Sequence, residues 1–173
     1  MEYACRACET VTAVPVAPAI IDRGIAAPGL LAQVLISKYV DHAPLYRQEA
    51  IFSRSGVSIP RSTLAEWTGI CGLRLQPLVE ALKSELLASP VLHADETPVA
   101  LLDPGAGKTR RAYLFAYATA AAGNPIVVFD FCTSRSGQHA ARFLGDYRGA
   151  LMVDDFAGYK ALFAQGILSL IHI

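Results

Sequence analysis

One change of pattern along this chain limits the folds that it can adopt. Up to Leu87 the apolar residues recur every three or four positions, as in amphipathic helices, whereas from Val91 onward they fall in short runs typical of strands. Ser89 and Pro90 stand at the change. A chain of 173 residues that is helical first and strand-rich afterwards is expected to be an α+β protein.

The helical part is expected to cover residues 30–88, after an extended lead-in over 1–29. The lead-in carries several prolines and glycines, which interrupt helices. Pro28 stands where the first turn of a helix tolerates proline, and Gly56 suits the left-handed end of another helix. The apolar spacing predicts helices over four stretches: 30–39, 45–52, 64–71 and 75–87.

The strand-rich part is expected over residues 89–167, in the order strand, strand, strand, helix, strand. Pro98 is expected to limit the first strand, so that this strand ends near Asp95. A turn sequence, Ala-Gly-Asn-Pro, separates the second and third strands, which indicates an antiparallel hairpin. The predicted elements are strands over 91–95, 112–119, 126–132 and 150–153, with a helix over 136–147 before the last strand.

Composition excludes several classes of protein. Lys and Arg number 15 against 15 Asp and Glu, so the chain does not hold nucleic acid by bulk charge in the manner of a histone. Hydrophobic residues make up 53% and charged residues 17%, which favours a folded core over disorder. The apolar runs are shorter than the roughly 18 residues of a membrane-spanning helix, and the first residues do not resemble a secretion signal. We therefore expect a cytoplasmic protein with reduced cysteines.

Two motifs suggest ligand sites that their contexts do not support. Gly105–Thr109 resembles the end of a phosphate-binding loop, but Leu102 stands where that motif requires its first glycine, so a glycine-rich hairpin loop is expected. Cys5 and Cys8 form half of a zinc-ribbon pattern, and no second pair follows them. The remaining cysteines stand alone among apolar residues and are expected in the core: Cys71 and Cys132.

Acidic residues end two of the predicted strands, at Asp95 and Asp154. If these strands are neighbours in the sheet, the carboxylates converge, although 59 positions separate them in the sequence (154 − 95 = 59). Carboxylate oxygens suit Mg²⁺, and ions held in this way can serve phosphoryl transfer. The alternative is that both acids are ordinary turn residues. His93 is expected to be a hydrogen-bonded neighbour of the first acid rather than a catalyst.

Much of the positive charge of the strand-rich part lies near these acids in the sequence. Such residues either track the phosphates of a nucleic acid or form a solvated face. The candidates for contacts with DNA phosphates are Lys108, Arg110, Arg111 and Arg135.

Four stretches of the strand-rich part, in order, resemble the central region of transposases of the insertion sequence 66 family. They are His93–Val99, Pro104–Thr109, Ser134–His139 and Val153–Tyr159. Three stretches of the helical part are similar to the region before the catalytic core of that family: Ser37–His42, Pro44–Gln48 and Arg61–Trp67. The resemblance covers roughly residues 3–167.

The resemblance implies a ribonuclease-H-like core that uses an Asp-Asp-Glu triad and Mg²⁺ to cut transposon ends and join them to target DNA. It matches the first two acids with Asp95 and Asp154, both as Mg²⁺ ligands. It matches Cys5 and Cys8 with the second half of a zinc site that only the intact N-terminal region would complete. It further implies DNA as a partner, a homo-oligomer in the intact parent, and the bacterial cytoplasm.

The sequence departs from the family in three places. Asp155 and Phe156 stand where the family usually has Gly and Tyr. The catalytic Glu of the family lies well downstream of this motif, and nothing in the chain matches it. Residues 168–173 do not resemble a transposase and are similar to a translation of the mosaic-end adapter used in tagmentation libraries, so we expect an artefactual tail.

We therefore interpret the chain as a fragment of a DNA transposase that lacks the third catalytic carboxylate and is not active as it stands. A second hypothesis is a truncated protein that only binds transposon-end DNA or full-length transposase subunits. A third is a structural protein whose strand-end acids are incidental, for which Mg²⁺ affects neither stability nor DNA binding. An incomplete sheet with an uncovered apolar face also predicts poor solubility.

Overall fold

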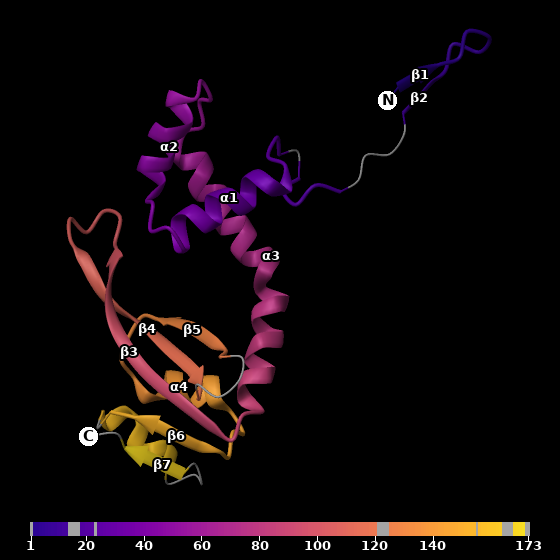
Figure 1. The fold of residues 1–173 in the computed structure, drawn as a ribbon. Coiled ribbons are helices and arrows are strands. Elements are labelled where there is room, and N and C mark those ends of the chain that lie inside the picture. The colour runs from indigo at the N-terminus through magenta and orange to yellow at the C-terminus, as the bar shows by residue number, and fades with distance from the viewer. Residues whose placement is uncertain are drawn as a thin grey trace. The chain divides into compact units, whose positions relative to one another are not determined.

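The computed structural model describes residues 2–13, 18–22, 24–120, 125–154, 156–163 and 168–171. The chain forms two compact units, Met1–Gln76 and Pro77–Ile173 (Figure 1). The first unit is mainly helical and the second carries a mixed sheet, which confirms the predicted α+β class.

The first unit contains a short antiparallel hairpin and three helical segments. The hairpin pairs β1 (Glu2–Ala4) with β2 (Val11–Ala13). The helices are α1 (Pro28–Tyr39), α2 (Leu45–Arg54) and the first part of α3 (Arg61–Leu87). Proline stands in the first turn of α1, as the sequence indicates.

A small apolar core holds the helices of the first unit together. Its buried side chains come from α1, from the approach to α3 and from α3 itself, and include Leu31, Val34, Ile59, Leu64 and Trp67. The buried side chain of Gln48 on α2 donates hydrogen bonds to the backbone carbonyls of Val34 and Ala43, which ties α2 to the end of α1.

The prediction of two helices over 64–71 and 75–87 is wrong, because one helix of 27 residues, α3, covers both stretches. The residues between them carry no stop signal, since Gly72 keeps a negative φ and Leu73 and Arg74 favour helix. Pro77 removes one backbone donor inside the helix without ending it, and the boundary between the two units falls at this proline. None of the described helices combines the length and apolar character needed to cross a membrane.

The second unit is built on a five-stranded sheet in the order β5-β4-β3-β6-β7. Strands β3, β4 and β5 are antiparallel neighbours, whereas β6 runs parallel to both β3 and β7. The elements in chain order are β3 (Val91–Leu102), β4 (Thr109–Thr119), β5 (Val127–Cys132), α4 (Gly137–Leu144), β6 (Ala150–Val153), the 3-10 turn η1 (Ala157–Tyr159), α5 (Lys160–Phe163) and β7 (Leu168–Ile171). This is a ribonuclease-H-like arrangement, and it confirms the predicted order of strand, strand, strand, helix, strand.

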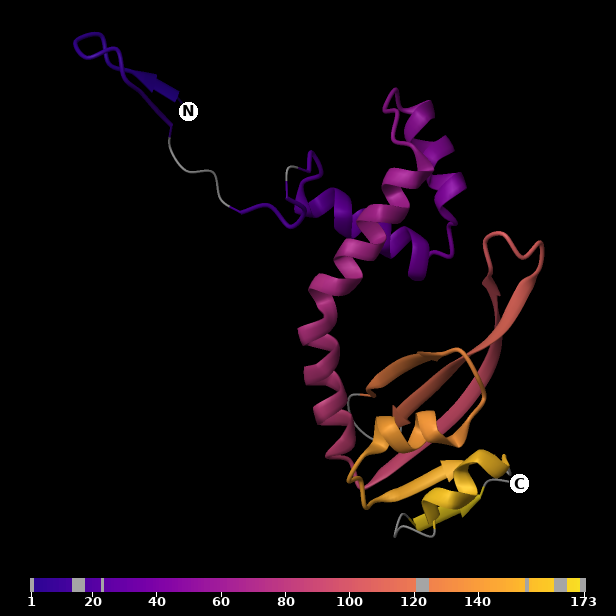
Figure 2. The same cartoon turned by 180° about the vertical axis from the view of Figure 1, so that it is seen from behind.

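One face of this sheet is covered and forms the main core. Helix α4 lies behind the sheet in Figure 1 and in front of it in Figure 2. The ring of Phe143 on α4 stacks on Tyr117 of β4 with 3.8 Å between centroids, and the buried cluster also contains Leu86, Leu92, Phe115, Leu144 and Leu151. The hydrophobic effect of burying these side chains fixes which face of each strand points inward.

Strand β3 continues seven residues past the predicted end at Asp95, so this prediction is wrong. Pro98 pairs with Tyr113 of β4, but β6 accompanies β3 only over Val91–His93, so the proline stands where no described strand flanks its other side. A missing N–H is tolerated at such an edge. Beyond it, residues 99–102 and 109–112 form a two-stranded ribbon with the predicted glycine-rich loop at its tip, which we call the β3–β4 arm (Figure 1).

Candidate metal centre

The register of β3 with β6, continued two residues beyond its last pair, brings the two candidate acids to the same height. Val91 pairs with Ala150, an offset of 59 positions (150 − 91 = 59), and Asp95 and Asp154 are separated by the same 59. Adjacent strands lie about 4.8 Å apart. The two strands are therefore neighbours, which is the condition under which the sequence expects the acids to converge. Asp95 lies within its strand, and only Asp154 follows the end of one.

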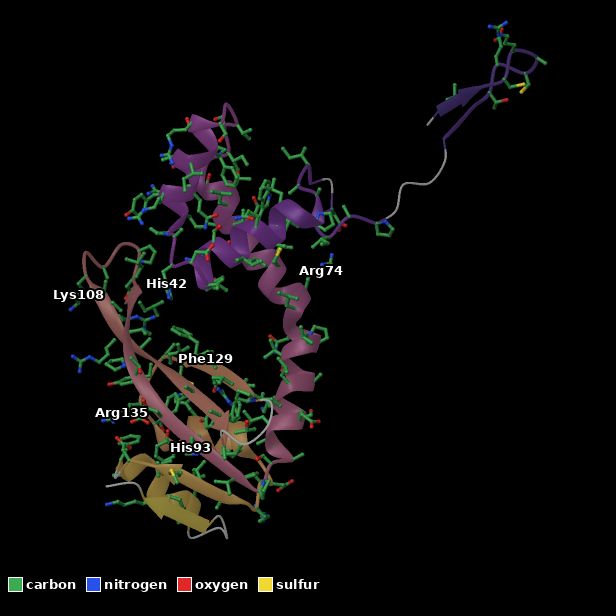
Figure 3. The ribbon with its side chains drawn as sticks, viewed as in Figure 1. His42, Arg74, His93, Lys108, Phe129 and Arg135 are labelled. Carbon is green, nitrogen blue, oxygen red and sulfur yellow. The ribbon has the colours of Figure 1, made fainter. Side chains whose placement is uncertain are left out.

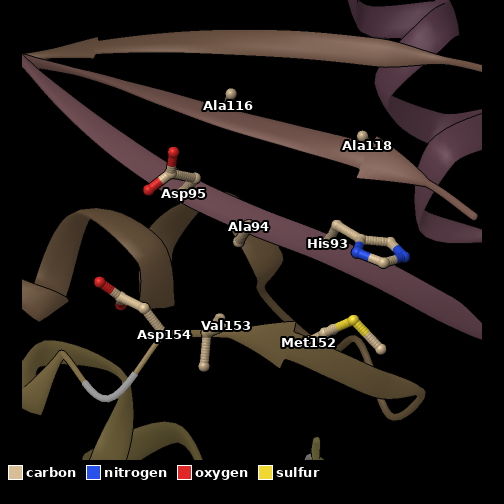
Figure 4. A pocket seen from close by; sticks show the side chains of 8 residues that line it. All are labelled: His93, Ala94, Asp95, Ala116, Ala118, Met152, Val153 and Asp154. Carbon is tan, nitrogen blue, oxygen red and sulfur yellow. The ribbon is translucent and has the colours of Figure 1, made fainter. Parts of the chain in front are cut away.

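Both acids line one pocket of about 290 Å³ on the open face of the sheet. Figure 4 shows the two carboxylates at one end of this pocket, with His93 and Met152 at the other end. Ala116 lies opposite Asp95 on β4, and its small side chain leaves room over the strand. The site therefore has the concave shape that a ligand or ion needs.

A backbone amide fixes one oxygen of each carboxylate. Oδ1 of Asp95 accepts a hydrogen bond of 2.8 Å from the N–H of Glu96, and Oδ1 of Asp154 accepts one of 3.1 Å from the N–H of Phe156. Within the described residues, no donor reaches the Oδ2 atom of either acid. Two oriented carboxylates with one unused oxygen each fit Mg²⁺, which takes oxygen ligands and keeps several waters.

The described residues supply only these two carboxylates to the site. No group of three or more His, Cys, Asp and Glu able to hold a metal is found among them. His93 lies in the pocket, two residues from Asp95 and on the same face of β3, and its supporting role stays a prediction. Asp155, which stands where the resembled family usually has glycine, lies outside the described residues.

Sequence reasoning missed a third acid, Glu96, because it treated the Asp-Glu pair only as part of a family motif. The Glu96 side chain is fully buried, on the face of the sheet opposite the pocket. Its Oε1 accepts a hydrogen bond of 2.9 Å from Nε of Arg135, and its Oε2 accepts one of 2.9 Å from the hydroxyl of Tyr159. The alternation of side chains along a strand was the available signal, since a residue next to one that faces the pocket points into the core.

The surroundings of Glu96 shift the pKa values of both its partners. Burial, followed by the charge of Glu96, raises the pKa of Tyr159 far above its ordinary value, so the phenol stays protonated and donates. The hydrogen bond to Glu96 raises the pKa of Arg135, and the charge of Asp154 adds to this rise. Arg135 and Tyr159 therefore both sense the charge of the pocket acid Asp154.

The four candidate DNA contacts fall into two places. Lys108, Arg110 and Arg111 are exposed on the β3–β4 arm, where Arg110 forms an ion pair of 3.2 Å with Asp103. Arg135 lies apart from the arm (Figure 3) and is bound to Glu96. The structure thus places three of these cations on the arm and the fourth on the buried carboxylate of Glu96.

The cysteines divide as the sequence indicates. Cys5 and Cys8 are exposed and not disulfide-bonded in the turn between β1 and β2, where hydrogen bonds with Thr10 and then with Cys5 lower the pKa of Cys8 to about 7. Cys71 and Cys132 are buried, which confirms the expectation that they belong to the core. A role of the exposed pair in zinc binding stays a prediction.

Comparison with known proteins places the chain in a family. The profile described as "Transposase IS66 family" matches residues 23–171. Three uncharacterized proteins of Sinorhizobium fredii (strain NBRC 101917 / NGR234) are similar to it: y4qI is 40% identical over 84% of this chain and 28% of its own length, y4jD is 37% identical over 92% and 32%, and y4hP is 28% identical over 93% and 30%. The chain thus spans about a third of the length of these relatives. Together with the ribonuclease-H-like sheet, this match shows that the chain belongs to the IS66 family of transposases.

Proposed function

We propose that Asp95 and Asp154 are two ligands of a Mg²⁺ site that serves DNA cleavage and strand transfer. The observation that carries this proposal is that Asp95 of β3 and Asp154, just after the neighbouring parallel strand β6, line one pocket. No donor of the described residues reaches the Oδ2 atom of either acid. Divalent metal ions are a general requirement of transposases that use acidic triads, which agrees with the carboxylate donors present here.

The residues of the chain have distinct parts in the proposed reaction. Bound Mg²⁺ would lower the pKa of an attacking water or DNA 3′-hydroxyl and stabilise charge on the leaving oxygen. Asp95 and Asp154 would hold the ion, and the backbone N–H groups of Glu96 and Phe156 keep their carboxylates from rotating. The open face of the sheet gives a phosphodiester access to this end of the pocket.

A third carboxylate of the triad is not among the described residues near the pocket. We infer that the complete activity belongs to a longer protein, in agreement with the 28–32% of the curated relatives that the chain covers. In this view residues 89–167 are the first part of the catalytic domain, and cleavage by the 173-residue chain alone is not expected.

The β3–β4 arm is the proposed DNA contact of the sheet unit. It carries three exposed cations, Lys108, Arg110 and Arg111, and one acid, Asp103, which forms an ion pair with Arg110, so positive charge is in excess at the end of the ribbon. Lys and Arg at such a position bind phosphates without reading base sequence. Replacing Lys108 and Arg111 with Gln is expected to weaken DNA binding evenly across sequences and to reduce the salt dependence by about one ion per contact.

The helical unit supports a second candidate function, binding without catalysis. Its helices have a core of their own, and one groove is lined by Lys38 and Arg61 against a single acid, Glu49, together with Ser62 at the start of α3. This arrangement suits contact with a DNA backbone, as in helical DNA-binding modules. Salt-sensitive binding of transposon-end DNA by residues 25–90 alone supports this function, and its absence counts against it.

The direct test of the catalytic proposal is a strand-transfer assay on a version of the protein as long as its relatives. We expect Asp95→Asn and Asp154→Asn to abolish the Mg²⁺-dependent product. Asp146→Asn is the matched control, because this substitution removes the same charge from a side chain that is fully exposed and lies outside the pocket. Retained product with Asp95→Asn contradicts the assignment.

A further inference from the structure

The two proposed metal ligands lie beyond the part of the sheet that fixes their separation. The described ladder between β3 and β6 ends at His93 and Met152, two residues before Asp95 and Asp154 respectively. Metal ligands need a defined separation and orientation, which residues behind them usually enforce. Contacts other than these strand hydrogen bonds must therefore set the separation and orientation of the Asp95 and Asp154 carboxylates.

Glu96 connects β3 with the segments that flank the second acid. It follows Asp95 directly, and because successive strand side chains point to opposite faces, Asp95 opens on the pocket while Glu96 passes to the covered face. There the fully buried carboxylate accepts hydrogen bonds from Arg135, just before α4, and from Tyr159 in η1. Because both of its oxygens accept hydrogen bonds, this buried carboxylate holds β3, the segment before α4 and η1 in fixed positions relative to one another.

Both partners of Glu96 lead to Asp154. The guanidinium of Arg135 lies 3.9 Å from the ring centroid of Phe156, and the backbone N–H of Phe156 holds Oδ1 of Asp154. The ring of Tyr159 meets the ring of Phe156 edge-on with 5.7 Å between centroids. A displacement of either partner therefore moves the amide that orients Asp154.

Close backbone packing between the start of α4 and η1 supports the same arrangement around Glu96. A Cβ atom added to Gly137, the first residue of α4, would overlap the backbone carbonyl of Gly158 in η1. The start of α4 and η1 thus touch through two glycines, and Arg135 and Tyr159, which lie close to these glycines in the sequence, both reach Glu96.

We propose that Glu96 is a positioning residue which, through Arg135 and Tyr159, fixes the segment after β6 so that the Asp154 carboxylate faces Asp95 across the pocket. None of the three residues lines the pocket, so they act through Asp154 rather than on a bound ion or substrate. The role of these contacts in metal binding rests on the proposed metal site. Their anchoring of Phe156 does not.

The test uses the 173-residue chain with Tyr159→Phe and Glu96→Gln, and Mn²⁺ as the probe. Tyr147→Phe is the matched control, because Tyr147 is also buried in this unit and its hydroxyl donates to a backbone carbonyl, that of Ala150, away from η1. Two quantities are measured: the hydrogen-exchange rate of the Phe156 amide without metal, and Mn²⁺ affinity from the electron paramagnetic resonance signal of the free ion.

We expect Tyr159→Phe to speed exchange of the Phe156 amide about fivefold and to weaken Mn²⁺ binding about fivefold to tenfold, with Glu96→Gln at least as large. Tyr147→Phe should lower thermal stability without either effect. Equal exchange at Phe156 in Tyr159→Phe, Glu96→Gln and the parent overturns the inference whatever Mn²⁺ does. Faster exchange in the two variants, together with a parent chain that binds no Mn²⁺, overturns the metal site and upholds the anchoring.

Discussion

Neutralising one pocket acid should stabilise the metal-free chain and remove its response to Mg²⁺. Without an ion, Asp95 in β3 and Asp154, just after β6, are like charges in one pocket. At about 6 Å in water two unit charges repel by about 0.7 kcal/mol, and screening at 0.1 M salt reduces this to roughly 0.4 kcal/mol. Asp154→Asn relieves that repulsion, which for a domain of this size corresponds to a rise in melting temperature of about 2–3 °C.

Mg²⁺ should raise the melting temperature of the parent above that of the two acid variants. At ten times its dissociation constant, an ion that binds only the folded chain adds about 1.4 kcal/mol, or about 6–11 °C in melting temperature. The parent gains this increment, whereas Asp154→Asn and Asp95→Asn lose most of it. Calorimetric melting in EDTA and in Mg²⁺, with Asp146→Asn as the control, measures both effects. An equal rise in the melting temperature of all four proteins with Mg²⁺ contradicts binding of the ion at these two acids.

Other residues give further predictions. Gly137→Ala should destabilise the sheet unit by about 1–3 kcal/mol, because the added Cβ meets the backbone of Gly158. Gly69→Ala, where the added Cβ meets open space on a helix, should stabilise the folded chain by up to about 1 kcal/mol. Denaturant titration distinguishes the two signs, and equal effects contradict the close contact between Gly137 and Gly158. Alkylation of Cys8 should accelerate as the pH rises through about 7 because the thiolate reacts, while the buried Cys71 stays unmodified in the folded chain; mass spectrometry at pH 6 and 8 decides this. Phe129→Thr should increase soluble yield, since this side chain is 59% exposed on the open face of the sheet, and an unchanged yield counts against that face as the cause of aggregation.

Local pattern predicted the sheet unit well and its strand ends poorly. The hairpin of β4 and β5 follows from turn chemistry between two β-rich runs, and both are found as predicted. The length of β3 does not follow, because the tolerance of Pro98 depends on which strands flank it, and that is a property of the assembled sheet. The break expected in α3 fails for a related reason: helix formers on both sides of Gly72 outweigh one unfavourable residue.

The candidate site shows the same division. Residue type and position singled out Asp95 and Asp154 but left them open as ordinary turn residues, and the family resemblance assigned them as metal ligands. Their common pocket depends on the two strands being neighbours. Glu96 could not be assigned to its partners from sequence, since 39 positions separate it from Arg135 and 63 from Tyr159. Arg135 was expected on DNA as a surface cation, whereas its contact with a buried carboxylate depends on the tertiary fold.

The most direct test of the proposed metal centre is to locate a bound ion. Mn²⁺ added in small amounts to the ¹⁵N-labelled chain broadens nuclear magnetic resonance signals of amides close to where it binds. The two-carboxylate site predicts that the amides of Asp95, Glu96 and Phe156 broaden first, and that Asp95→Asn abolishes this selectivity. Broadening centred elsewhere, or scattered over the acidic surface in parent and variant alike, contradicts a metal site at Asp95 and Asp154.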